Sequence, residues 1–176
     1  MMFLLRLILY FLHFFNILNM TREETFMQEA IALSRQALET NQGGPFGCVI
    51  VKDDVIIGRG NNMVTLTNDP TAHAEVVAIR DACATLNHFQ LDGCEVYTSC
   101  EPCPMCLGAI YWARPSAIYF ANNRQDAAEY GFDDSMIYEE IAADNNNRKI
   151  PIKCLSRQQA LEVFELWKNK PNKTIY

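Results

Sequence analysis

The spacing of apolar side chains predicts where the first helix begins and ends. Thr21 followed three residues later by Glu24 is the pattern of a capping box, which satisfies the free backbone N–H groups at a helix start. Beyond it, apolar residues recur at helical spacing and share one face: Phe26, Ala30, Leu33 and Ala37. The Asn-Gln-Gly-Gly-Pro run at 41–45 stops this helix, because Gly and Pro disfavour helical backbone.

The rest of the chain alternates between strand and helix patterns. Short apolar, β-branched runs predict strands at residues 46–51, 55–58, 94–98 and 116–121. Helical composition predicts helices at 72–86, 102–113, 135–141 and 157–168. Lys-Asp-Asp at 52–54 predicts a hairpin turn, and the polar stretch 61–71, with Pro70, predicts a loop. Alternating strands and helices indicate an α/β sandwich.

Composition limits the classes of function. The chain has 176 residues, of which 49% are hydrophobic, and this predicts one compact domain over residues 20–176. A net charge of −6 weighs against a nucleic-acid partner, because binding to phosphates favours basic surfaces. Seven cysteines, unevenly placed, fit a disulfide framework poorly. They favour a reducing, cytoplasmic location and a metal site.

The first nineteen residues form a separate hydrophobic block in which only Arg6 and His13 are ionisable. Three interpretations remain open. Met20 is the true start of the domain, or residues 1–19 are a membrane anchor of marginal length, or they are a signal peptide that lacks a small-residue cleavage site. We favour the first, and expect no membrane partner.

Three residues are candidate zinc ligands: His73, Cys103 and Cys106. Two cysteines three residues apart at a helix start project on one face, and the positive end of the helix favours their thiolate forms. One histidine and two thiolates leave a fourth tetrahedral position open, as in catalytic zinc sites. Glu75, two residues after His73, can then take a proton from water and pass it to a leaving amine.

The two-cysteine motif alone indicates a redox pair or half a structural zinc site about as often as it indicates a catalytic site. The pattern becomes more specific because His73-x-Glu75 and Pro102-Cys103-x-x-Cys106 occur together, with no second Cys-x-x-Cys motif. This combination is the signature of zinc-dependent nucleobase deaminases, from which the roles of these residues are taken.

Longer stretches resemble one family in particular. Residues 68–75 (NDPTAHAE) and 98–113 (TSCEPCPMCLGAIYWA) are similar to bacterial guanine deaminases of the cytidine deaminase superfamily, as are GPFG at 44–47, GFDD at 131–134 and the terminal Tyr176. The resemblance spans residues 20–176. It implies a three-layer α/β/α sandwich with a mixed five-stranded sheet, one Zn²⁺ per chain, and a homodimer that exchanges residues 156–176.

The resemblance also implies residue roles. Phe46 and Asn62 would line a purine pocket, Asp134 would bind the base, Trp112 would stack on it, and Tyr176 would close the partner's site. Backbone N–H groups near Ala74 and Cys103 would help to hold the substrate. The implied reaction is hydrolysis of guanine to xanthine and ammonia, with Glu75 moving the protons.

The chemistry of guanine supports this choice of purine. Guanine presents N1–H and a 2-amino group as donors, so its pocket needs an acceptor, and Asp133 and Asp134 supply two candidates. Three alternatives remain: a guanosine deaminase, a tRNA adenosine deaminase, which the acidic charge disfavours, and a structural zinc protein without activity.

Overall fold

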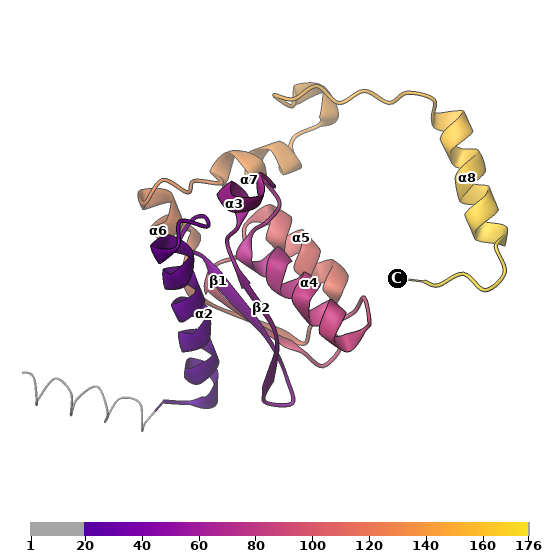
Figure 1. The fold of residues 1–176 in the computed structure, drawn as a ribbon. Coiled ribbons are helices and arrows are strands. Elements are labelled where there is room, and N and C mark those ends of the chain that lie inside the picture. Colours follow the sequence, from indigo (N-terminus) through magenta and orange to yellow (C-terminus); the bar gives the residue numbers. More distant parts are fainter. Residues whose placement is uncertain (1–19, 176) are drawn as a thin grey trace, which may run out of the picture.

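A computed structural model describes residues 20–175. Within this range the chain forms one mixed sheet with the strand order β2-β1-β3-β4 (Figure 1). The strands are β1 (Gly47–Lys52), β2 (Val55–Asn61), β3 (Glu95–Cys100) and β4 (Ala117–Asn122). Strand β1 is antiparallel to both β2 and β3, whereas β3 and β4 are parallel. The expectations for residues 1–19 and for Tyr176 lie outside the described residues.

Seven α-helices occur among the described residues: α2 (Arg22–Glu39), α3 (Val64–Thr67), α4 (Ala74–Leu86), α5 (Pro104–Ala113), α6 (Arg124–Glu129), α7 (Ser135–Ala142) and α8 (Arg157–Asn169). Five of them match the sequence prediction to within two residues at each end. Helices α3 and α6 were not predicted. With four and six residues, they are too short to show a helical period of apolar positions.

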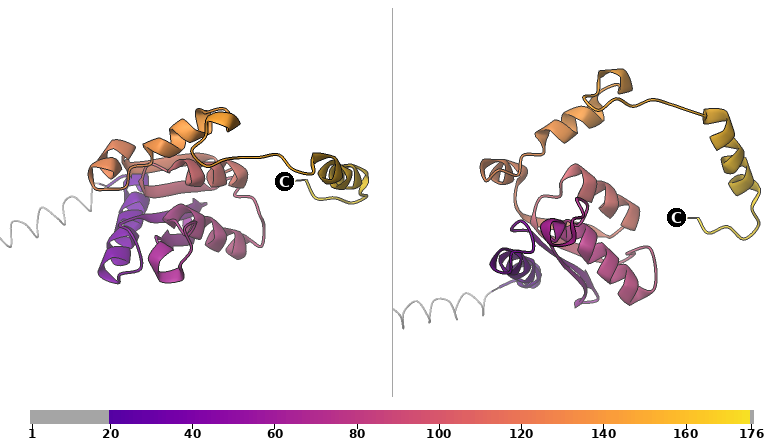
Figure 2. Two further views of the ribbon diagram at one scale, coloured as in Figure 1. Left: turned by 90° about the horizontal axis from the view of Figure 1, so that it is seen from above. Right: turned by 45° about the horizontal axis from the view of Figure 1, so that its top comes forward.

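Helices cover both faces of the sheet, which confirms the predicted α/β sandwich (Figure 2). Successive side chains of a strand point to opposite faces. In β1, Cys48 and Ile50 belong to the core beneath α4 and α5, while Val49 and Val51 belong to the core beneath α2. These four β1 side chains are completely buried, so β1 is an interior strand covered on both faces.

The expectation of a five-stranded sheet is wrong for the described residues, because only four strands pair. The fifth strand rested on the family resemblance, and no fifth run in the apolar pattern supported it. After β4 the chain forms α6 and α7 instead. Residues 151–155 then run without a partner strand, and Ile152 and Leu155 are exposed there.

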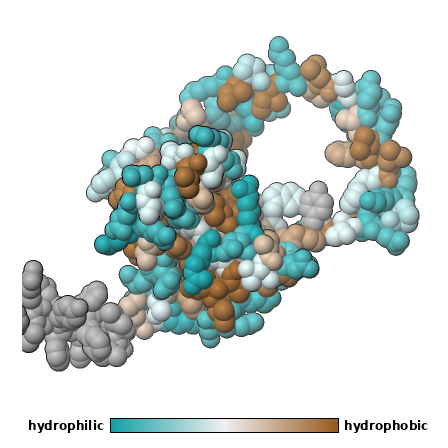
Figure 3. All heavy atoms as spheres, viewed as in Figure 1, coloured by the Kyte–Doolittle hydropathy of each residue, from teal (hydrophilic) through white to brown (hydrophobic). Residues whose placement is uncertain are grey.

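The last helix stands apart from the sandwich (Figure 1). We call residues 148–175 the arm. Figure 3 shows hydrophobic side chains along it, and the exposed apolar residues of α8 are Val163, Phe164, Leu166 and Trp167. An amphipathic helix is normally stabilised by burying its apolar face. The described residues of this chain leave that face uncovered. No helix in the described range is long and apolar enough to cross a membrane.

The start of α2 has the predicted capping box. The Thr21 hydroxyl accepts a hydrogen bond from the Glu24 N–H, and the Glu24 carboxylate accepts one from the Thr21 N–H. Arg22 ties this helix start to the sheet, since its guanidinium donates to Glu95 at 2.7 Å and to Tyr97 at 3.1 Å.

We therefore expect a protein that begins at Met20 to fold as stably as the full chain, as measured by thermal unfolding. The sensitivity control is Thr21→Ala. Loss of a cap costs about 1 kcal/mol, or a fall of roughly 2–4 °C in Tm. If the Tm of the protein that starts at Met20 fell by more than that of Thr21→Ala, residues 1–19 would stabilise the domain.

Candidate active site

Two helix starts bring three metal-ligating side chains together. His73 is the N-cap of α4, Cys103 is the N-cap of α5, and Cys106 lies in the first turn of α5. The Nδ1 atom of His73 lies 3.6 Å from the Cys103 Sγ and 3.5 Å from the Cys106 Sγ. The ligand atoms of all three residues lie within 4.8 Å of one another, so they could hold one metal ion.

Contacts within this group favour a thiolate. A hydrogen bond from Cys106 and another from His73 lower the pKa of Cys103 to about 4. The same Cys103–Cys106 contact and burial raise the pKa of Cys106. The contact with Cys103 also raises the pKa of His73. Because the thiolate is the form that binds metal, Cys103 is prepared for coordination.

Glu75 lies directly beside the metal-ligating group. Its side chain is buried, and burial raises the pKa of its carboxyl above the usual range. The Cys106 thiol contacts Oε2 at 3.4 Å, and the Thr98 hydroxyl of β3 donates to Oε1 at 3.2 Å. Glu75 is therefore held by two neighbours, and its raised pKa suits a group that both accepts and donates protons near neutral pH.

Glycines in β2 set the position of α4 over the sheet. A Cβ atom on Gly60 would lie 2.1 Å from the Ala74 carbonyl oxygen, and one on Gly58 would lie 2.6 Å from the Ala78 carbonyl oxygen. Only glycine lets the helix lie this close to the strand. This close approach places His73 and Glu75 near the carboxyl end of β3.

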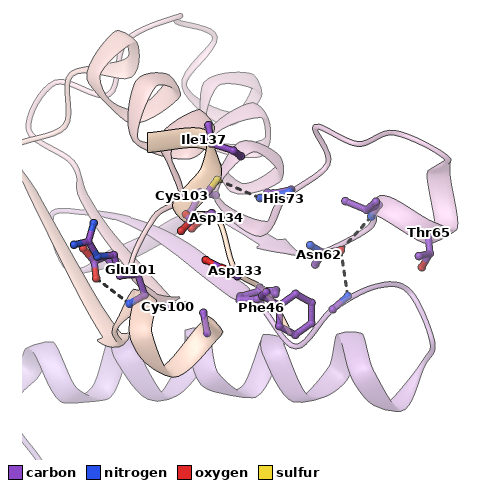
Figure 4. A pocket seen from close by; sticks show the side chains of 16 residues that line it. Phe46, Asn62, Thr65, His73, Cys100, Glu101, Cys103, Asp133, Asp134 and Ile137 are labelled. Carbon is purple, nitrogen blue, oxygen red and sulfur yellow. Dashed lines mark hydrogen bonds between the residues drawn. The ribbon is translucent and has the colours of Figure 1, made fainter. Parts of the chain in front are cut away.

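One cavity of about 380 Å³ contains most of the predicted site (Figure 4). Seven residues that the sequence analysis named as candidates line it: Phe46, Asn62, His73, Glu75, Cys103, Asp133 and Asp134. The Phe46 ring packs edge-on against Phe132, with 4.8 Å between the ring centroids. The cavity thus combines an aromatic wall, a metal-ligating group and several polar side chains, as small-molecule sites do.

The two neighbouring aspartates differ in surroundings. The Asp133 carboxylate accepts a hydrogen bond from the Ser135 N–H at 2.9 Å, which lowers its pKa. Asp134 makes no side-chain capping bond to α7 within the described residues, and partial burial raises its pKa. Both aspartates line the cavity, but one oxygen of the Asp133 carboxylate already accepts from Ser135, which leaves Asp134 as the less engaged acceptor of the two.

The structure does not bring Trp112 to this cavity. Trp112 lies six residues after Cys106 on α5, which turns it about 120° away from Cys106 around the helix axis. Its side chain is 66% exposed and lines a separate hollow with Phe89 and Thr174. Ala74 is fully buried and does not line the cavity.

Sequence reasoning missed several residues around the cavity. Thr98 contacts Glu75, and Thr65, Arg124, Phe132 and Ile137 line the cavity. The guanidinium of Arg124 lies over the Tyr138 ring, 5.2 Å from its centroid. Phe132 lies within the GFDD stretch, but no spacing marks any of these residues as cavity-lining, because their positions depend on strand register and on the path of α3, α6 and α7.

Residues 20–122 match the family model of the cytidine and deoxycytidylate deaminase zinc-binding region. The chain belongs to this family. A donor set of one imidazole nitrogen and two thiolates suits Zn²⁺ and leaves one tetrahedral position for water or substrate, so the residues present fit a catalytic zinc ion.

Individual relatives refine this placement. The chain is 55% identical to the guanine deaminase of Bacillus subtilis over 153 residues, which are 87% of this chain and 98% of that relative. The X-ray structure of that guanine deaminase superposes with a TM-score of 0.85. A tRNA-specific adenosine deaminase of Aquifex aeolicus is 40% identical over 56% of this chain and 65% of its own. A guanine deaminase structure from Nitrosomonas europaea is 28% identical, with a TM-score of 0.59, over 78% of this chain and 70% of its own.

Proposed function

We propose that residues 20–176 form a catalytic domain that hydrolyses guanine to xanthine and ammonia. The observation that carries the proposal is the placement of the buried Glu75 carboxylate beside the group of His73, Cys103 and Cys106, inside a cavity that also holds Asp134. The extensive similarity to a guanine deaminase supports guanine as the substrate.

The proposed roles follow from the contacts. His73, Cys103 and Cys106 hold zinc, which when bound lowers the pKa of water and so makes it a nucleophile at neutral pH. Glu75 takes one proton from this water and passes it to a ring nitrogen as the water oxygen bonds to C2. It then takes the second proton from the resulting hydroxyl and donates it to the amine, so that the C2–N bond breaks and ammonia leaves. Thr98 keeps the carboxylate in place through its hydrogen bond to Oε1. One water enters and one ammonia leaves.

Recognition of the base divides between the two ends of the cavity. The Phe46 and Phe132 rings offer an aromatic wall for a planar purine. Asp134 offers the acceptor that the N1–H and 2-amino donors of guanine require. Asn62 faces the remaining edge of the base. Backbone N–H groups help to hold the base at the starts of α4 and α5, near Ala74 and Cys103.

Asp134→Asn should raise KM or lower kcat/KM for guanine by about 5- to 100-fold, because an amide in its place leaves a buried substrate donor poorly paired. Asp133→Asn is the matched control and should change kcat/KM much less, since that carboxylate already binds the Ser135 N–H. Equal effects in steady-state kinetics would mean that Asp134 has no special role.

Ammonia release from guanine, guanosine, adenine and cytosine tests the proposed function directly. We expect turnover of guanine. Turnover of guanosine in preference to guanine would identify a nucleoside deaminase, and ammonia release from none of the four would contradict the proposal.

All seven cysteines are free thiols in the described chain, which supports a reducing, cytoplasmic location.

The arm supports a homodimer with exchanged C-terminal segments. Its α8 helix leaves Phe164 and Leu166 about 70% exposed, and burying such side chains needs a second surface. Charge favours a second copy of this chain as that surface. Residues 148–173 carry seven Lys and Arg and two Glu, whereas residues 20–147 carry seven basic and nineteen acidic side chains. A basic arm would be attracted to an acidic domain.

Phe164→Asp combined with Leu166→Asp should therefore yield a monomer with reduced guanine turnover, as measured by light scattering and ammonia release. Gln159→Asp, on the same helix, is the control for added charge. Removal of residues 174–176 should leave the dimer and zinc intact but lower guanine turnover, because Tyr176 is proposed to close the partner's site. Full activity of a monomeric variant would show that each chain has a complete site.

A further inference from the structure

Two consecutive glycines, Gly43 and Gly44, lie between α2 and β1 at the edge of the cavity. A Cβ atom on Gly43 would lie 2.1 Å from Asn62 Oδ1 and 2.6 Å from the Asn62 carbonyl oxygen. Both distances are far below van der Waals contact. The backbone at Gly43 is not left-handed, so what the position requires is space, and any larger residue must displace Asn62 or the turn.

The turn also determines how the Asn62 amide is oriented. Its Oδ1 accepts hydrogen bonds from the Gly44 N–H at 3.3 Å and from the Val64 N–H at 3.2 Å, drawn as dashed lines in Figure 4. These two bonds use both lone pairs of the oxygen. The amide nitrogen is therefore the atom left for the cavity, which Asn62 lines.

Further hydrogen bonds fix the distance between the glycine turn and Asn62. The carbonyl oxygen of Gln42 accepts from the Leu66 N–H at 3.1 Å and from the Thr65 hydroxyl at 2.9 Å. The turn at 42–44 is thus tied to α3, and Asn62 lies between them. Because the segments are held this closely, a side chain at position 43 cannot be accommodated by a simple outward shift of the turn.

We propose that Gly43 is a positioning residue that holds Asn62 as a hydrogen-bond donor. The cavity then has a fixed polarity: Asn62 donates at one side, and the Asp134 carboxylate accepts at another. The proposal rests on the proposed function and deepens it. The substrate must present an acceptor, such as an oxo group or a ring nitrogen, to Asn62 and donors to Asp134, as a 6-oxopurine can.

Hypoxanthine is a suitable probe, because it keeps the 6-oxo group, N1–H and N7 of guanine but lacks the 2-amino group that would be hydrolysed. We expect Gly43→Ala to weaken hypoxanthine binding, measured by calorimetry, by about 5- to 100-fold, with zinc content unchanged. The matched control is Gly108→Ala. A Cβ on this α5 glycine would meet nothing within 4 Å among the described residues, so binding should not change.

Asn62→Asp distinguishes positioning from general damage. The aspartate keeps an oxygen for the two N–H groups but replaces the donor with an acceptor, so hypoxanthine binding should fall by a similar factor. In this background Gly43→Ala should have little further effect. An equal loss in both backgrounds, or an unchanged affinity in Gly43→Ala, would overturn the positioning role. If Gly43→Ala does not fold, unchanged affinity in Asn62→Asp alone overturns the inference.

Ammonia release from guanine by the unaltered chain separates this inference from the proposed function. If that reaction is absent but hypoxanthine binding still depends on Gly43 as described, the positioning role stands and the proposed reaction fails. If guanine is hydrolysed and Gly43→Ala binds hypoxanthine normally, the reaction stands and the positioning role fails.

Discussion

Cys106→Ser should remove both the bound zinc and the activity. A serine hydroxyl does not ionise near neutral pH, so the site would lose a thiolate and retain only His73 and Cys103 as metal-binding side chains. We expect zinc, measured by elemental analysis, to fall from about one ion per chain to a small fraction of that, and ammonia release to fall to background. The buried position of Cys106 leaves little room for a water molecule to replace the missing ligand.

Cys154→Ser is the control for loss of a thiol, because Cys154 is exposed on the arm, far along the chain from the site. It should keep both zinc and turnover. Cys106→Ser protein that still hydrolyses guanine while containing almost no zinc would show that the reaction does not need the metal.

The grouping of the candidate zinc ligands was predictable because each lies at a helix start that the sequence marks. Helix α5 begins at a proline, and two cysteines three residues apart must then share one side of its first turn. His73 and Glu75 similarly bracket the start of α4. Helix-capping and helical-spacing patterns in the sequence predict these positions. Only the approach of the start of α4 to the start of α5 depends on the fold.

Residues brought in by strand register were not predictable in this way. Thr98 reaches Glu75 because β3 lies next to β1 in the sheet and beneath α4, an arrangement that no local pattern encodes. Gly43 was seen only as the end of a helix, because its contact with Asn62 forms across a loop whose path the sequence does not mark. The family resemblance was informative about the chemistry but implied five strands, of which the described residues form four.

Glu75→Gln should abolish most of the turnover while leaving the metal in place. Glutamine has the size of glutamate and can still accept the hydrogen bond from Thr98, so the fold and the zinc ligands should be undisturbed. Its amide cannot accept the proton of water or pass one to the leaving amine. General acid–base catalysis typically contributes about 10²- to 10⁴-fold, and here one carboxylate serves several transfers, so we expect kcat to fall at least that far.

Thr98→Val gives an intermediate test of the same carboxylate. It removes the hydroxyl donor to Oε1 but keeps the volume of the buried side chain and the proton-accepting group. Loss of one such hydrogen bond should lower kcat by roughly 5- to 20-fold, far less than Glu75→Gln does. Thr98→Ser keeps a hydroxyl donor, so its kcat should lie between those of Thr98→Val and the unaltered chain. Zinc content should stay unchanged in all three variants. If Glu75→Gln kept more than about a tenth of the turnover, another group would have to carry the proton transfer. A glutamine amide cannot take up the proton, so a true loss of the general base should lower the rate far more than tenfold.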